Sequence, residues 1–255
     1  MRPSIAAVAR RLATGTALLG ALLGLTAATP ASRPAGTLVL WAWERAEDLR
    51  FTAGSSNEIA FVAATIRLSG DRALLRHRTA PLLVPKDARL IPVIHVDYGR
   101  DLALDDKQRT AFVNAVMRGL ANLAADIVQI DFEALPSQRA FYAQALGELR
   151  QRLPPGTKLS ITALASWCMY ESWTASLPVD EVVPMLFRMG SGSAAQYAID
   201  GGGDFRQGNC RSALGVSTDE KRRRLPPGRR VYVFNPKAWD QASYLTVMQE
   251  AESWQ

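Results

Sequence analysis

The chain has 255 residues, and its 30 basic and 24 acidic side chains give a formal net charge of +6. This length suits one large domain, and α/β barrels commonly occupy such a length as a single unit. If residues 1–31 are removed, Arg2, Arg10 and Arg11 leave with no acid, and the charge falls from +6 to +3. A basic balance this modest does not argue for nucleic-acid binding, and we expect no nucleic-acid partner.

The N-terminal segment, residues 1–31, has the three-part pattern of an export signal. A basic start precedes the apolar run LATGTALLGALLGLTAA, and ATPAS supplies small residues around a cut after Ala31. We therefore expect an exported protein, periplasmic or secreted, whose mature domain is residues 32–255. The apolar run is short and interrupted by Gly and Thr, so we expect no stable membrane span after cleavage. Retention by an uncleaved N-terminal segment is the alternative.

Two cysteines, Cys168 and Cys210, remain in the mature chain. An oxidising compartment permits a disulfide between them, and two buried free thiols are the alternative. Only His77 and His95 could serve as imidazole ligands. The sequence therefore shows no metal-binding motif, and we expect neither a metal nor a cofactor.

Eight strand-like apolar runs follow along the mature chain. They span residues 37–43, 58–68, 89–97, 126–134, 158–167, 181–189, 212–218 and 229–239. Most of these runs are continuous rather than alternating, which is typical of parallel strands that are covered on both faces.

Helical spacing of apolar residues appears in three of the intervening segments, 105–125, 136–153 and 240–254. Connections in the second half are less regular, and the segment before the last run leaves room only for a very short helix. The pattern predicts a (β/α)8 barrel with abbreviated helices in the second half. A doubly wound open sheet is the alternative, but the Gly-rich phosphate loop typical of nucleotide-binding members is missing after the first run.

The fourth run ends with polar residues on one face. Gln129, Asp131 and Glu133 alternate with apolar residues and so point the same way. Because a barrel places its chemistry at the carboxyl ends of its strands, we expect Glu133 at the mouth and Asp131 one layer below. Asp131 can hydrogen-bond Glu133 and raise its pKa, which would keep Glu133 protonated as a general acid.

The other strand ends supply further candidate substrate-binding residues, with Gln129 of the fourth run among them. They are Trp43, Glu44, His95, Asp97, Trp167, Arg188, Asp219, Asn235 and Trp239. Carboxylates interleaved with tryptophans predict a sugar cleft, because flat apolar rings stack on sugar faces. Structural roles are the alternatives: Trp43 as a core residue, His95 as a satisfied structural histidine and Asp219 as a helix cap.

The sequence DIVQIDFE, residues 126–133, resembles the D-G-x-D-x-D-x-E signature of family eighteen glycoside hydrolases, the chitinase-type barrels. Asp126, Asp131 and Glu133 match this signature. The sequence VDEVVPMLF resembles the sixth strand of that family, with Met185 in the matching place. The resemblance implies a barrel in which Glu133 protonates the leaving glycosidic oxygen and Asp131 supports it.

The chain departs from that family at three positions. Gln129 replaces the middle Asp of the signature, and Phe187 and Arg188 replace a Tyr and an Asp of the sixth strand. The replaced groups normally position an N-acetyl group as an internal nucleophile, so we do not expect cleavage of chitin, and Arg188 indicates an anionic sugar. Through SWC, VPMLFRMG, GVSTDE and IDFEA the whole chain resembles a bacterial family of exported proteins with no assigned function.

We therefore expect an exported glycoside-hydrolase-like barrel that acts on a cell-envelope or extracellular polysaccharide by general acid catalysis. A second carboxylate would come from Asp97, Glu44 or Asp219, and its distance from the acid decides between retention and inversion. The alternative is a catalytically silent barrel that binds a glycan or an envelope partner. The sequence does not predict an oligomeric state.

Overall fold

The computed structural model describes residues 38–189, 193–220 and 225–254. The expected signal peptide, residues 1–31, lies outside these residues. The chain divides into two units, Met1–Arg33 and Pro34–Gln255, and all described residues belong to the second unit.

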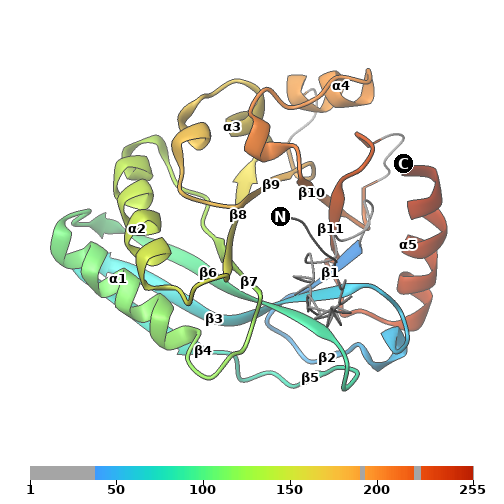
Figure 1. Ribbon diagram of the computed structural model, residues 1–255, viewed down its shortest axis with the longest axis horizontal. Coiled ribbons are helices and arrows are strands. Elements are labelled where there is room, and N and C mark those ends of the chain that lie inside the picture. Colours follow the sequence, from blue (N-terminus) through green and yellow to red (C-terminus); the bar gives the residue numbers. More distant parts are fainter. Residues whose placement is uncertain (1–37, 190–192, 221–224, 255) are drawn as a thin grey trace, which may run out of the picture. The chain divides into compact units, whose positions relative to one another are not determined.

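Within the described residues, eight parallel strands close into a barrel (Figure 1). They are β1 (Leu38–Ala42), β3 (Glu58–Gly70), β6 (Arg89–Leu102), β7 (Ile127–Asp131), β8 (Lys158–Leu164), β9 (Glu181–Met185), β10 (Ala213–Ser217) and β11 (Arg230–Phe234). The barrel closes where β11 pairs with β1, with Val39 opposite Tyr232. Each of the eight apolar runs coincides with one of these strands, and the predicted (β/α)8 barrel is confirmed.

The three predicted helices are present as α1 (Asp106–Gly119), α2 (Arg139–Arg152) and α5 (Gln241–Trp254). In the second half of the barrel, the connections contain short helices, α3 (Ala165–Met169) and α4 (Ala194–Asp200), as the sequence predicted. The described residues also contain four 3-10 turns: η1 (Arg50–Thr52), η2 (Pro136–Gln138), η3 (Trp173–Ser176) and η4 (Gly208–Cys210).

Helix α1 shows why these segments are helical and where they stop. The Asp105 side chain accepts a hydrogen bond from the Gln108 backbone N–H at 2.8 Å and caps the first turn. Phe112 and Val116 are buried against the sheet, as helical spacing predicts. The helix is shorter than the predicted segment because the chain turns at Asn122, whose φ of 65° is left-handed.

The connection between β3 and β6 was not predicted. Instead of a helix it contains β4 (Arg72–His77), which pairs antiparallel with the carboxyl half of β3. Gly70 permits the sharp reversal because its φ of 54° lies in the left-handed region. A two-stranded sheet, β2 (Glu47–Asp48) with β5 (Leu82–Leu83), lies beside it.

The barrel interior is filled by side chains. An apolar cluster that includes Val39, Val93 and Val183 packs inside the strands. Below it, Glu181 accepts hydrogen bonds from Ser160 at 2.8 Å and from Tyr232 at 2.7 Å. The interior is therefore a packed core, and a ligand has to bind at the mouth.

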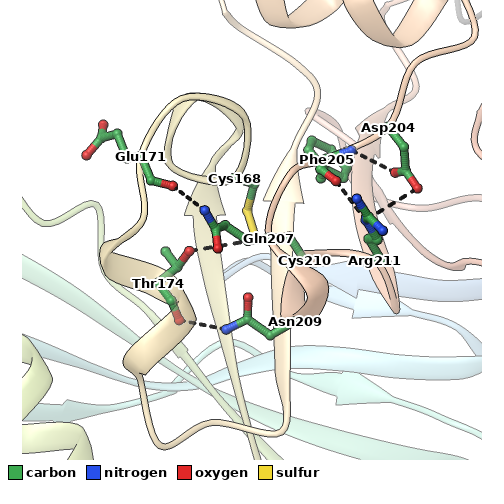
Figure 2. The surroundings of a disulfide bond; sticks show 9 residues. All are labelled: Cys168, Glu171, Thr174, Asp204, Phe205, Gln207, Asn209, Cys210 and Arg211. Atoms are coloured by element: carbon green, nitrogen blue, oxygen red, sulfur yellow. Dashed lines mark hydrogen bonds and ion pairs between the residues drawn. A yellow bond between two sulfur atoms is a disulfide. The ribbon is translucent and has the colours of Figure 1, made fainter.

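A disulfide joins Cys168 and Cys210 (Figure 2). It links α3, which follows β8, to the turn that precedes β10. Hydrogen bonds from Gln207 to the Glu171 carbonyl oxygen at 2.8 Å and from Asn209 to the Thr174 carbonyl oxygen at 2.6 Å flank the bond. The disulfide thus fastens two connections that contain only short helical turns, and it excludes the interpretation of two free thiols.

Candidate active site

A cavity of about 550 Å³ lies at the carboxyl ends of the barrel strands. We call it the acid cavity because it contains Glu133. Its walls come from β1, β6, β7, β9 and β11 and from the residues that follow these strands. They include Trp41, Trp43, His95, Asp97, Tyr98, Asp131, Glu133, Phe187, Arg188 and Phe234.

Glu133 and Asp131 line the acid cavity together. Glu133 as a whole residue is exposed to solvent. Even so, partial desolvation of its carboxyl, reinforced by the negative charge of Asp131, raises the pKa of Glu133 above its usual value. The charge of His95 acts in the opposite direction and is the smaller effect. A raised pKa is what a general acid near neutral pH requires.

Asp131 is buried, and both of its carboxylate oxygens are engaged. Its Oδ1 accepts a hydrogen bond from the Thr162 hydroxyl at 2.7 Å, and its Oδ2 lies 2.7 Å from Nδ1 of His95. The expected hydrogen bond from Asp131 to Glu133 is therefore replaced by bonds to these two neighbours. Asp131 acts on Glu133 through its charge.

His95 connects two carboxylates. Its Nδ1 faces Asp131, and its Nε2 lies 3.2 Å from Oδ1 of Asp97. Burial disfavours the charged imidazole, but the hydrogen bond with Asp131 and the charges of both carboxylates outweigh burial and raise the pKa of His95. The edge of the ring meets Trp43, with ring centroids 4.9 Å apart. His95 therefore holds a fixed position beside Glu133.

The opposite wall of the acid cavity is aromatic. Phe187 and Phe234 stack with centroids 5.5 Å apart and planes 8° from parallel. The ring centroids of Trp41 and Phe234 are 5.2 Å apart, and Trp41 is buried, with 6% of its surface exposed. Within the described part of the chain the Trp41 indole N–H has no hydrogen-bond partner. This wall offers flat apolar faces and one buried donor.

The predicted tryptophans Trp167 and Trp239 do not line the acid cavity. Trp167 is 1% exposed and packs against Trp173 under the guanidinium of Arg139. Its run was predicted as strand to residue 167, but β8 ends at residue 164 and α3 turns Trp167 into the core. Trp239 is also buried, and its indole N–H donates to the Trp41 carbonyl oxygen at 3.1 Å. These two tryptophans are therefore core residues that lie outside the acid cavity.

Asp219 and Asn235 also lie outside the cavity. The Asn235 side chain accepts a hydrogen bond from the Thr218 hydroxyl at 3.0 Å. Asp219 accepts one from the Ser217 hydroxyl. Asn235 directly follows β11 and lies between the cavity residues Phe234 and Pro236, and Asp219 lies two residues beyond β10; both side chains brace the turns there.

The three residues that differ from the chitinase-type barrels occupy different parts of the structure. Gln129 is buried in the barrel interior and donates a hydrogen bond to Ser160 at 3.1 Å. Phe187 belongs to the aromatic wall. Arg188 lines the acid cavity with a left-handed φ of 53°, and its guanidinium lies 3.9 Å from Asp219. Arg188 therefore places a cation at the position where the chitinase-type barrels have an aspartate.

Glu44 lies in a neighbouring cavity of about 500 Å³. Its carboxylate accepts hydrogen bonds from the Thr65 hydroxyl at 3.2 Å and from the Arg76 guanidinium at 2.8 Å. Trp43, His95 and Asp97 line both cavities. The candidate residues at the end of β1 are therefore divided between two adjoining spaces.

Sequence reasoning missed Thr162, Phe187 and Phe234 as residues of the site. For Thr162 a signal exists, because Ser160 and Thr162 alternate as polar residues within a buried run and so share one face. The phenylalanines carry no such signal, since an apolar residue at a strand end also suits the core.

Neither a metal site nor a membrane helix is found in the part of the chain that the structure describes. No group of three or more His, Cys, Asp or Glu side chains there could hold a metal ion. No helix among these residues has both the length and the apolar character needed to cross a bilayer.

The fold and the site define a (β/α)8 barrel with a carboxylate pair and an aromatic wall at its mouth. The chain is similar to the solved structure of a candidate chitinase A from Streptomyces coelicolor, with a TM-score of 0.53 and 13% identity over 85% of this chain and 95% of that one. It is also similar to the Bacillus cereus spore cortex-lytic enzyme SleL, with a TM-score of 0.49 and 15% identity over 86% of this chain.

The chain spans 59% of the SleL structure's length. At these identities the likeness is one of fold, and it confirms the distant resemblance to chitinase-type barrels at that level. No protein-family model matches the chain. No curated protein matches it either.

Proposed function

We propose that the protein is an exported glycoside hydrolase of a cell-envelope or extracellular polysaccharide, with Glu133 as its general acid. The observation that carries the proposal is the environment of Glu133, which combines an aromatic-walled cavity at the barrel mouth with a raised pKa. A carboxyl with a raised pKa keeps its proton at higher pH and can give it to a glycosidic oxygen.

In the proposed reaction, protonated Glu133 transfers its proton to the glycosidic oxygen as the bond from that oxygen to the anomeric carbon breaks. The leaving sugar departs as an alcohol, and Glu133 becomes a carboxylate. In one route water adds directly to the anomeric carbon and gives its proton to the second carboxylate. In the other route the second carboxylate first bonds to that carbon, and water then displaces it while the Glu133 carboxylate takes the proton from water. We assign the second carboxylate to Asp97, which lines the same cavity, whereas Glu44 is held by Arg76.

Asp131 and His95 are positioning residues in this scheme. Asp131 supplies the negative charge that helps to raise the pKa of Glu133. His95 and Thr162 fix the orientation of Asp131 through their hydrogen bonds. The arrangement keeps the negative charge of Asp131 beside Glu133, and Asp131 does not take the proton of Glu133.

Four further observations support a sugar ligand and export. Aromatic faces such as that of Phe187 suit the apolar faces of sugar rings, and the exposed guanidinium of Arg188 suits an anionic substituent. The solved barrel with the higher TM-score is named as a candidate chitinase. The Cys168–Cys210 disulfide supports export, because disulfides persist mainly in oxidising compartments.

A second candidate function is glycan binding without turnover. It is favoured by the engagement of both Asp131 oxygens and by the neutral Gln129 below them, which leave Glu133 without a hydrogen-bonded carboxylate partner. A barrel with these features keeps its cleft and its aromatic wall.

The test is a screen for released reducing sugar on peptidoglycan, chitin, cellulose, xylan and alginate. Purified protein is compared with Glu133→Gln, and binding to the same polysaccharides is measured in parallel. Turnover that is lost in Glu133→Gln while binding remains supports the hydrolase. Turnover that survives the substitution contradicts the assignment of Glu133. Binding without turnover by the unmodified protein supports the second candidate.

A further inference from the structure

The neighbouring cavity of about 500 Å³ is separated from the acid cavity only by side chains that face both spaces. Trp43, His95 and Asp97 form this partition. The far walls are made by Glu44 at the end of β1 and by Thr65 and Arg76 on β3 and β4. We call this space the hairpin cavity, after the β3–β4 hairpin that forms its outer side.

The hairpin cavity exists because the barrel wall opens at the mouth between β1 and β3. These two strands pair only from Val39 opposite Glu58 to Ala42 opposite Phe61. Further along β3, residues 64–69 pair with β4 instead. The end of β1 and the hairpin therefore diverge, and the cavity lies between them as a sideways extension of the mouth.

The wall of the hairpin cavity is held in place by Arg78. Its guanidinium donates to the carbonyl oxygen of Trp43 at 2.8 Å and to that of Ala80 at 2.9 Å. A further hydrogen bond reaches the Arg45 carbonyl oxygen. Arg78 thus ties the loop after β4 to the segment after β1, and the space is formed before a ligand arrives. Such preorganisation lowers the entropy that binding costs.

A row of polar residues runs from the hairpin cavity to the acid cavity. Arg76 lies opposite Thr65, Thr65 opposite His95, and His95 opposite Asp131 in the registers of four adjacent strands. Residues in register on neighbouring strands share one face of the sheet. The two cavities therefore have one continuous polar floor that ends beside Glu133.

The charges of the hairpin cavity are compensated. Glu44 forms a two-point pair with Arg76, and Asp97 faces His95. The lining thus offers many hydrogen-bond donors and acceptors but no unpaired cation for an anionic group. Its ligand should be uncharged and rich in hydroxyl groups. This character differs from the aromatic wall and exposed Arg188 of the acid cavity.

Resting on the proposed function, we propose that the hairpin cavity is a second sugar subsite. It binds an uncharged, hydroxyl-rich unit of the polysaccharide next to the unit that lies beside Glu133. The substrate is then a chain that crosses the partition of Trp43, His95 and Asp97. Short oligosaccharides that occupy only the acid cavity should bind more weakly than longer ones.

The experiment measures the binding of oligosaccharide ladders to Glu133→Gln, in which turnover is blocked. Ladders from monosaccharide to hexasaccharide are prepared from chitin, cellulose, xylan, alginate and peptidoglycan and titrated by calorimetry. Thr79→Trp, added to this background, places a large side chain in the hairpin cavity, whose wall includes Thr79. Thr110→Trp is the matched control, because Thr110 lies on the exposed face of α1. Arg76→Gln is a second, smaller change that removes the guanidinium.

We expect affinity to rise about tenfold or more between the short and the longer members of at least one ladder that contains uncharged units, the size of one to two net hydrogen bonds. A rise confined to alginate, whose units are all charged, contradicts the uncharged character of the subsite. Thr79→Trp and Arg76→Gln should remove this rise, whereas Thr110→Trp should keep it. A rise that persists in both cavity variants contradicts the second subsite and leaves the role of Glu133 intact. Affinity that is independent of length also contradicts it. If no ladder binds and the unmodified protein releases no sugar, the proposed function fails together with this inference.

Discussion

The two sides of the acid cavity differ in their side chains, which are polar on one side and aromatic on the other. On the side of β6 and β7, Asp131, His95 and Asp97 form a hydrogen-bonded set beside Glu133, and the pKa values of Glu133 and His95 are raised. On the side of β9 and β11, Phe187 and Phe234 present stacked rings. In the proposed reaction, proton transfer and binding of the sugar therefore depend on residues of separate strands. Substitutions on the two sides should therefore separate turnover from binding.

The largest of the effects compared here is expected for Asp131→Asn on the polar side. Loss of the charge removes one of the causes of the raised pKa of Glu133 and weakens the contact with His95. We expect kcat to fall about a hundredfold, at the lower end of the range for general acid catalysis. Glu133 is active when protonated, so activity is present below its pKa and is lost as pH rises through it. The high-pH limb of the rate profile should therefore move to lower pH.

The matched control for this substitution is Asp126→Asn, at the amino end of the same strand. It should leave the rate profile unchanged, because Asp126 lies outside both cavities. If the high-pH limb of the rate profile stays at the same pH in Asp131→Asn, the charge of Asp131 has no effect on the pKa of Glu133. That result would contradict the role given to the polar side of the cavity.

A smaller effect is expected for Phe187→Ala on the aromatic side. The substitution removes the stacked partner of Phe234 and one apolar face of the cavity. Aromatic contacts of this kind contribute about 0.5–1.5 kcal/mol beyond area burial, so we expect KM to rise about tenfold while kcat changes little. Phe51→Ala is the control, because Phe51 packs on Tyr244 and lines neither cavity. Equal losses in kcat and in affinity would mean that the two sides act as one unit.

The smallest effect on activity is expected from replacing both cysteines with serine. The bond closes a loop with a sequence separation of 42 residues, and chain-entropy estimates assign such a cross-link roughly 3–4 kcal/mol of stability. We expect a clear fall in Tm by calorimetry, with kcat and KM near the unmodified values well below Tm. A loss of activity at temperatures where the variant is folded would show that the second-half connections also shape the site.

The barrel could be predicted from sequence because its strands are covered on both faces and so appear as continuous apolar runs. Helices α1, α2 and α5 could be predicted because the apolar residues that each helix buries recur at helical spacing in the sequence. The β3–β4 hairpin could not be predicted, because the segment 72–77 is short and carries arginines on its exposed face. The hairpin is held by pairing with β3, a contact between strands that composition does not reveal.

The candidate site was predicted where residues belong to the strand itself. Asp131, His95 and Asp97 lie on β7 and β6, and strand alternation decides which face they occupy. Beyond the strand ends the prediction was less regular: Trp43, Glu133 and Arg188 line the acid cavity, whereas other predicted residues do not. Trp167 turns into the core on α3, and Asn235 braces a turn.

The most direct test of the central claim is the dependence of Glu133→Gln on the leaving group. Once the screen has identified the sugar, kcat/KM is measured for the natural oligosaccharide and for a dinitrophenyl glycoside, whose leaving group departs without a proton. We predict a loss of about a hundredfold or more on the natural bond and little loss on the activated one. Equal losses on both substrates would contradict the assignment of Glu133 as the general acid.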